Sequence, residues 1–235
     1  GRSRQPGAVC PRLMMGGMDL SALVQAIAIA ALPVILAITL HEAAHGYAAR
    51  HFGDPTAWMQ GRITLNPLKH IDPVGTVALP LVLFAIGSPF VFGWAKPVPV
   101  NFGNLRNPKR DMLWVAAAGP AANLAMALFW GAVLKLAWLL PLNYFSVPMA
   151  EMAKFGIAAN VVLMVLNLFP LPPLDGGRIA VSLLPHRAAW KFAQIERFGF
   201  PILLVLLFTG ILGKILQPIM AVVTVVIETV FQLPI

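Results

Sequence analysis

Long apolar stretches separated by short polar segments dominate the chain from residue 20 onward. A membrane-spanning helix needs about 20 apolar residues. Four stretches meet this length or come close to it, and they cover residues 20–49, 112–140, 152–169 and 198–231. The pattern leaves open whether the last stretch is one tilted helix or a broken pair, because it contains Gly210 and Pro218.

A fifth apolar stretch, residues 74–92, is interrupted by Pro80 and by a Gly-Ser-Pro sequence at residues 87–89. Irregular backbone at membrane depth is tolerated only where protein or a wet cavity surrounds it. We therefore interpret this stretch as a re-entrant or hairpin element instead of a clean crossing.

Composition supports a multi-pass membrane protein, since 59% of the residues are hydrophobic and 11% are charged, against about 25% charged in soluble domains. The net charge of +8 does not indicate nucleic acid, because the basic residues lie in short loops that flank apolar segments. A single cysteine, Cys10, excludes an internal disulfide and a cysteine-based zinc site. We expect residues 1–19 to be a flexible tail and residues 20–235 to form one transmembrane domain.

The first apolar stretch contains a cluster of ionisable residues, His41-Glu42-Ala43-Ala44-His45, and no other charge. On a helix His41 and His45 project from the same face, so both imidazoles can bind one zinc ion while Glu42 lies beside the open coordination position. Ionisable side chains cost roughly 2.5 to 3.5 kcal/mol each within the bilayer unless a partner compensates them. The cluster therefore predicts a zinc site with an adjacent general base.

A catalytic zinc ion takes a third protein ligand and keeps one position for water. Asp175 is the best candidate, because it follows an apolar span and lies in a segment with three prolines and two glycines, residues 167–177. Such a break at membrane depth is typical of functional sites. The alternative is an ordinary loop that ends a helix.

Together, the His-Glu-x-x-His cluster and the Asn-x-x-Pro-x-Pro-x-Leu-Asp-Gly element at residues 167–176 closely resemble the site-2 protease family of intramembrane metalloproteases. A Gly-Pro-x-x-Asn element at residues 119–123 extends the resemblance over residues 20–185. The chain has no room for the PDZ or CBS domains found in other members, so it resembles a minimal member.

The resemblance implies an all-α polytopic membrane protein with about four to six transmembrane helices around one zinc ion. It also implies a zinc metalloendopeptidase that cleaves transmembrane substrates within or near the bilayer, with Glu42 as catalytic acid and base and with zinc ligands His41, His45 and Asp175. Asn123 and Asn167 are candidates to bind the substrate or the oxyanion, although asparagine in a membrane helix more often bonds a neighbouring helix.

Other functions predict other residues. A catalytically inert scaffold that binds metal and partner helices needs no carboxylate like that of Glu42. A metal transporter would align polar residues along several helices, whereas one cluster is visible. A membrane zinc protease with a glutamate as last ligand would use Glu151, Glu196 or Glu228, which lack a suitable context.

The metal site also constrains topology, because Asp175 can join the histidines only if the first and third clear spans end on the same side of the membrane. Residues 74–92 must then cross the membrane zero or two times. Seven Lys and Arg residues in 50–111 and four in 170–197 lie on that side, and residues 141–151 contain none. The positive-inside rule places the site toward the cytoplasm, and we expect a prokaryotic plasma membrane.

Residues 92–101 and 61–66 are rich in Gly, Pro and β-branched residues, which is typical of short edge strands. A protease must unwind a substrate helix to reach its carbonyls, and adding the substrate as a strand would hold it extended. The alternative is an interfacial loop anchored by Trp94.

Overall fold

The computed structural model describes residues 20–85 and 93–233. Four helices in this part of the chain are long and apolar enough to cross a membrane, which confirms the predicted all-helical, multi-pass architecture. They are α1 (Leu20–His51), α4 (Pro108–Leu139), α5 (Ser146–Asn167) and α9 (Ile211–Phe231). The last predicted stretch is a broken pair, because Gly210 adopts a left-handed conformation (φ 72°) between α8 (Glu196–Phe208) and α9.

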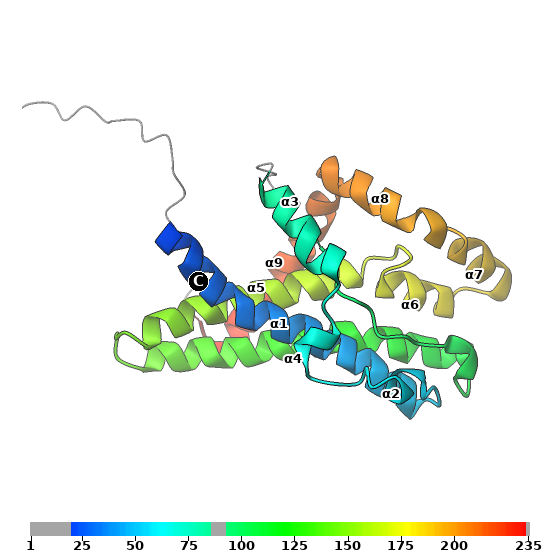
Figure 1. Cartoon of the computed structure of the whole chain (residues 1–235), viewed down its shortest axis with the longest axis horizontal. Coiled ribbons are helices and arrows are strands. Elements are labelled where there is room, and N and C mark those ends of the chain that lie inside the picture. The colour runs from blue at the N-terminus through cyan, green and yellow to red at the C-terminus, as the bar shows by residue number, and fades with distance from the viewer. Residues whose placement is uncertain (1–19, 86–92, 234–235) are drawn as a thin grey trace, which may run out of the picture.

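Shorter helices connect these spans. Before α4 lie α2 (Thr56–Met59), the 3₁₀ turn Pro67–Lys69, the π-helical segment Pro73–Ala78, α3 (Leu79–Ala85) and the 3₁₀ turn Phe102–Asn104. After α5 come α6 (Asp175–Leu183) and α7 (His186–Ala193). In Figure 1 these two helices lie beyond the end of α5 at which Asn167 is found.

Helices α1, α4 and α5 form the centre of the bundle and pack along one another (Figure 1). Small residues let their backbones approach closely, as is usual where lipid removes the hydrophobic driving force between helices. A Cβ atom on Gly156 of α5 would lie 2.4 Å from the ring of Trp130 on α4, and one on Gly131 would lie 2.7 Å from Phe231 on α9. These close contacts fix the positions of α4, α5 and α9 relative to one another.

The prediction of a short β element is wrong for the described residues, which contain no strand. Residues 61–66 form turns and bends, and residues 93–101 are extended without pairing as a strand. Single contacts hold this extended segment instead, because the Lys96 N–H donates to the His70 carbonyl at 2.9 Å and Arg62 donates to the carbonyls of Lys96 and Pro97. A β-like composition therefore produced an extended segment that does not pair with another strand.

The structure gives no support for the predicted re-entrant or hairpin element at residues 74–92, whose described part is helical as far as Ala85. Its remaining part, residues 86–92, lies outside the described residues, as does the predicted tail at residues 1–19. The start of the helical part is fixed by Asp72, whose carboxylate accepts the N–H groups of Val74 and Gly75 at 3.0 and 2.7 Å. This is ordinary N-terminal capping.

Candidate metal centre

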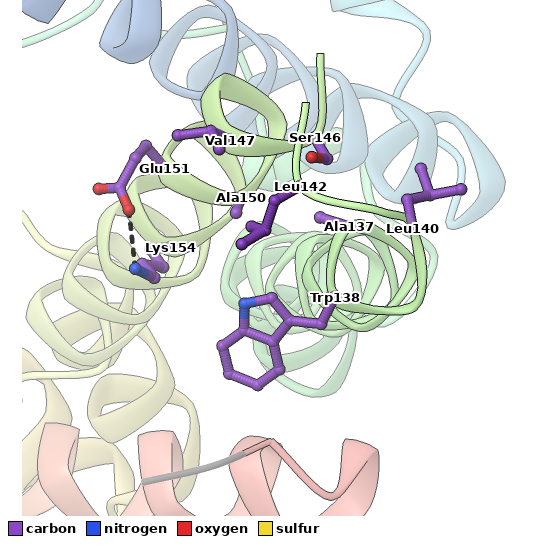
Figure 2. A pocket seen from close by; sticks show the side chains of 9 residues that line it. All are labelled: Ala137, Trp138, Leu140, Leu142, Ser146, Val147, Ala150, Glu151 and Lys154. Atoms are coloured by element: carbon purple, nitrogen blue, oxygen red, sulfur yellow. Dashed lines mark hydrogen bonds and ion pairs between the residues drawn. The ribbon is translucent and has the colours of Figure 1, made fainter. Parts of the chain in front are cut away.

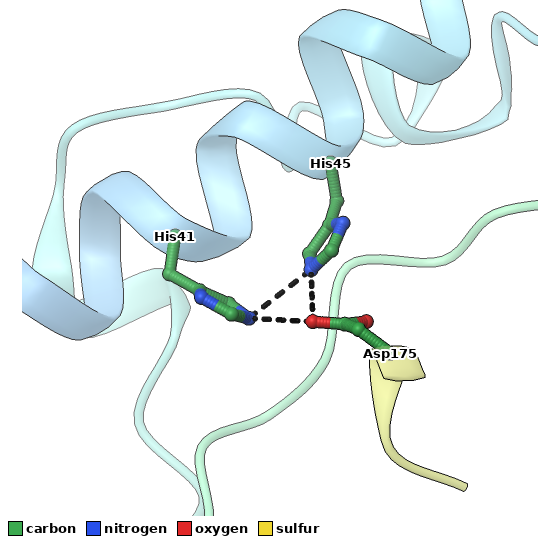
Figure 3. Close-up of side chains that lie close together, drawn as sticks. All are labelled: His41, His45 and Asp175. Carbon is green, nitrogen blue, oxygen red and sulfur yellow. Dashed lines mark hydrogen bonds and ion pairs between the residues drawn. The ribbon is translucent and has the colours of Figure 1, made fainter. Parts of the chain in front are cut away.

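The fold brings three predicted metal ligands together (Figure 3). His41 Nε2 and His45 Nε2 each lie 3.3 Å from Asp175 Oδ2, and 3.1 Å from each other. The two imidazoles leave the same face of α1, one turn apart, and the carboxylate comes from the first residue of α6. All three side chains are largely buried, so the group is shielded from bulk solvent.

Hydrogen bonds to the outer ring nitrogens fix the tautomers of both histidines. His45 Nδ1 lies 2.7 Å from the Val115 carbonyl, which only accepts, so this nitrogen carries the hydrogen. His41 Nδ1 lies 2.6 Å from Asn123 Oδ1 and donates in the same way. In each neutral imidazole the lone pair is therefore on Nε2, the atom that faces Asp175.

This arrangement fits a zinc ion. Two ligands on a tetrahedral zinc with bonds of about 2.0–2.1 Å lie about 3.3 to 3.4 Å apart, close to the separations in this cluster. Two imidazole lone pairs and a carboxylate oxygen would repel one another at such distances without a cation between them. Asp175 Oδ2 is also buried and accepts no hydrogen bond from the described residues, as expected of an atom that binds a metal.

Glu42 lies next to this group on α1 and is held by the extended segment that precedes α4. The Val98 main-chain N–H donates to Glu42 Oε2 at 2.7 Å. Val98 itself is buried and packs near Gly46 of α1, where an added Cβ would lie 3.3 Å from Val98 Cγ1. A charge-assisted hydrogen bond of this kind fixes a carboxylate at one position.

The position of Asp175 follows from the break after α5. Prolines at residues 170, 172 and 173 cannot continue the helix, and the chain turns so that α6 can begin at Asp175. Glycine is required at residue 176, because a Cβ atom there would lie 2.2 Å from the Leu168 carbonyl oxygen. The other end of α6 is anchored to α4, since Lys109 donates to the Leu184 carbonyl.

Gly119 of α4 lies directly against the two histidines. A Cβ atom at this position would lie 2.4 Å from His45 Nε2 and 2.7 Å from His41 Nε2. The sequence indicates close packing at this glycine, and the structure shows that its packing partners are the Nε2 atoms of the two predicted histidine ligands. Any side chain at residue 119 would occupy the space in which these nitrogens converge.

The two candidate asparagines differ in their surroundings. Asn123 is fully buried and donates its amide hydrogens to the Ala37 carbonyl (3.2 Å) and to Asn160 Oδ1 (3.0 Å). Asn167 is partly buried and donates to the Leu163 carbonyl of its own helix at 2.9 Å. Asn123 therefore bonds neighbouring helices, while Asn167 lies at the end of α5 near the turn that carries Asp175.

The sequence analysis missed Asn160 and the main-chain groups of Val98 and Val115. Asn160 was detectable, because it lies seven residues before Asn167 on the same face of an apolar helix, where a polar side chain needs a partner. The two main-chain groups carry no sequence signal, since any residue can supply an N–H or a carbonyl.

A pocket of about 420 Å³ lies at the opposite end of α4 and α5, around the turn that joins them (Figure 2). It is lined mainly by apolar side chains and by the ion pair between Glu151 and Lys154 (2.7 Å). None of the predicted site residues lines it. It is therefore separate from the candidate metal centre.

Two histidines and an aspartate that converge inside a helical membrane bundle, with a glutamate beside them, define the class of membrane-embedded metallohydrolases. The family model "Peptidase family M50" matches residues 143–210. "Putative zinc metalloprotease YwhC" of Bacillus subtilis is 42% identical over 190 residues, covering 80% of this chain and 83% of the relative. "Putative zinc metalloprotease Rip2" of Mycolicibacterium smegmatis is 32% identical, covering 77% and 66%. No solved structure matches.

The chain belongs to peptidase family M50, the site-2 protease family. It is an intramembrane zinc metalloprotease, as the resemblance in its motifs predicts.

Proposed function

We propose that the chain hydrolyses peptide bonds in or near transmembrane segments of membrane-protein substrates, with His41, His45 and Asp175 as zinc ligands and Glu42 as catalytic acid and base. One observation carries this assignment: three metal-binding atoms from α1 and α6 converge within 3.1 to 3.3 Å of one another. The described residues 20–85 and 93–233 supply all four groups, so we propose that residues 20–235 act as one protease domain.

A zinc ion held by His41, His45 and Asp175 would supply Lewis-acid polarisation of the scissile carbonyl and of the attacking water. Glu42 removes a proton from the water and later gives it to the leaving amine, which is the usual dual role of a carboxylate next to a metal. The Val98 N–H holds Oε2 of Glu42, which leaves Oε1 to carry the proton. Burial of the surrounding helices restricts how much water reaches the reacting bond.

The two asparagines take different roles in this proposal. Both amide hydrogens of Asn123 are engaged with Ala37 and Asn160, and its Oδ1 accepts from His41, which supports orientation of a ligand as its role. Asn167 uses one amide hydrogen for the Leu163 carbonyl. We assign its second amide hydrogen to the substrate backbone or the oxyanion.

We further propose that the site faces the cytoplasm in a prokaryotic plasma membrane. The segments on the same side as the ends of α1 and α5 contain eleven Lys and Arg residues, and the turn between α4 and α5 contains none. The relatives YwhC and Rip2 described above come from the bacteria Bacillus subtilis and Mycolicibacterium smegmatis. Cysteines are placed singly at residues 69 and 143 in a Cys10→Ser background, and intact cells are treated with an impermeant thiol reagent to test this orientation. Only the residue-143 variant should react.

Cleavage of a single-pass test substrate in liposomes by the purified protein tests the proposed function. Wild-type protein should cleave, and both Glu42→Gln and chelator-treated protein should not, while Glu42→Gln should still bind one zinc ion. Zinc binding by wild type without cleavage of any substrate in a panel of single-pass proteins would instead support the alternative of an inert metal-binding scaffold. Cleavage by Glu42→Gln at the wild-type rate would contradict the assignment of the base.

A further inference from the structure

A chain of buried amides connects the metal centre to the middle of α5. Asn123 and Asn160 are both fully buried. Asn160 Nδ2 donates to the Gly156 carbonyl at 2.8 Å, and Asn160 Oδ1 accepts from Asn123 Nδ2 at 3.0 Å. Asn123 Oδ1 in turn lies 2.6 Å from His41 Nδ1. The connected groups come from α5, α4 and α1, in that order.

Each hydrogen bond in this chain of amides can run in only one direction from donor to acceptor. The Gly156 carbonyl only accepts, so the NH₂ group of Asn160 must face it, and Oδ1 must face Asn123. The NH₂ group of Asn123 therefore faces Asn160, which leaves its Oδ1 for His41. An acceptor beside Nδ1 requires a hydrogen on that nitrogen and places the lone pair of His41 on Nε2.

This chain of hydrogen bonds depends on which way the Asn123 amide group is rotated. When the oxygen of Asn123 faces His41, the Nε2 atom of His41 is free to bind a metal. If the NH₂ group of Asn123 faced His41 instead, His41 Nδ1 would have to accept a hydrogen bond. The hydrogen would then move to Nε2, the atom that faces Asp175. The Ala37 carbonyl also accepts from Asn123, but at 3.2 Å it is the longer of the two contacts.

We propose that Asn160 is a positioning residue for the zinc site, which acts through Asn123 to fix the tautomer of His41. The inference rests on the proposed role of His41 as a zinc ligand. Asn160 touches none of the three metal-binding atoms, so its whole effect on zinc affinity passes through the Asn123 amide. Removing a group that hydrogen-bonds a ligating histidine, as Asn123 does, typically changes metal affinity by about 10- to 100-fold, and we expect Asn160 to act at the lower end of that range.

A double-mutant cycle on zinc affinity tests the proposal, with wild type, Asn160→Ala, Asn123→Ala and the double variant purified in detergent and titrated with zinc against a chelating indicator. Asn160→Ala should weaken zinc binding about ten-fold. In the Asn123→Ala background the same substitution should change the affinity by less than about two-fold, because the group it acts through is gone. Thermal unfolding of the zinc-free proteins establishes that each variant is folded.

Asn167→Ala is the matched control, because Asn167 lies on the same helix and also donates to the carbonyl four residues earlier, at 2.9 Å. Its zinc affinity should stay within about two-fold of wild type. Equal losses from Asn160→Ala in both backgrounds would show a purely structural role and overturn the inference, as would unchanged affinity in Asn160→Ala. Zinc binding that survives His41→Ala would instead overturn the proposed ligand set.

Discussion

The main-chain N–H of Val98 donates to Oε2 of Glu42 at 2.7 Å, across 56 residues of sequence. The proposed general base is thus held by a segment that has no regular structure of its own. Arg62 stabilises this segment from the other side, because its Nη2 donates to the carbonyls of Lys96 and Pro97 at 3.0 and 3.2 Å. Arg62 follows the proposed ligand His45 by 17 residues and is not one of the proposed site residues.

Replacing Arg62 with alanine should lower kcat about ten-fold, equivalent to about 1.4 kcal/mol on the barrier. The reason is that the Val98 N–H is then less firmly placed and Glu42 samples more positions. Zinc affinity should remain unchanged, because Arg62 contacts none of the ligands. Cleavage rates and zinc titrations on the same preparations measure both effects. Arg187→Ala removes an exposed arginine on α7 as a control, and an equal loss in that variant would refute the explanation.

Replacing Gly119 with alanine should abolish zinc binding. The added methyl group would lie 2.4 Å from His45 Nε2, far inside van der Waals contact, so the imidazoles must move apart. Elemental analysis of the purified protein measures the zinc content. Gly213→Ala on α9 is the control, since a Cβ atom there meets nothing within 4 Å, and it should retain one zinc ion. Full zinc content in Gly119→Ala would show that α4 can shift to accommodate the methyl group, and it would contradict the prediction.

The buried carboxylate of Asp54 should stabilise the segment before α4 in a pH-dependent way. Burial opposes its ionisation, but hydrogen bonds from Thr56, Asn104 and the Asn101 N–H outweigh this effect and hold the pKa of Asp54 below its ordinary value of 3.8. Because the pKa is lower in the folded state, the stabilisation is complete above about pH 4 and is lost as the pH falls through the folded-state pKa.

Asp54→Asn should therefore lower the free energy of unfolding by about 1–3 kcal/mol at pH 7, since an amide nitrogen would face hydrogen-bond donors. The difference between wild type and variant should shrink as the pH drops below about 4. Thermal unfolding of both proteins in detergent over a pH series measures this difference. The titration of other groups cancels in the comparison, because both proteins contain them. A difference that stays constant down to pH 2 would show that the charge of Asp54 is not what stabilises the segment.

Hydrophobic pattern alone predicted the spans because a bilayer imposes one length and one secondary structure on each crossing. The group formed by His41, His45 and Asp175 was predictable because helical spacing joins the first two and a break at membrane depth marks the third. The segment at residues 93–101 was mistaken for a strand, since Val is common in strands and a residue that precedes proline is held extended whether or not a partner strand exists. Its true partners are a side chain and isolated carbonyls, which no local pattern specifies.

Zinc should raise the thermal stability of the protein, and each ligand should be needed for this effect. A ligand that binds only the folded state stabilises by about 2.7 kcal/mol at a concentration of 100 Kd. Wild type and Glu42→Gln should both show a higher Tm with zinc than with a chelator, because Glu42 is not a ligand in the proposed site. Asp175→Ala should show almost no difference, since its removal leaves only the two imidazoles of α1. A zinc-dependent rise in Tm of wild-type size in Asp175→Ala would place the bound ion elsewhere in the protein.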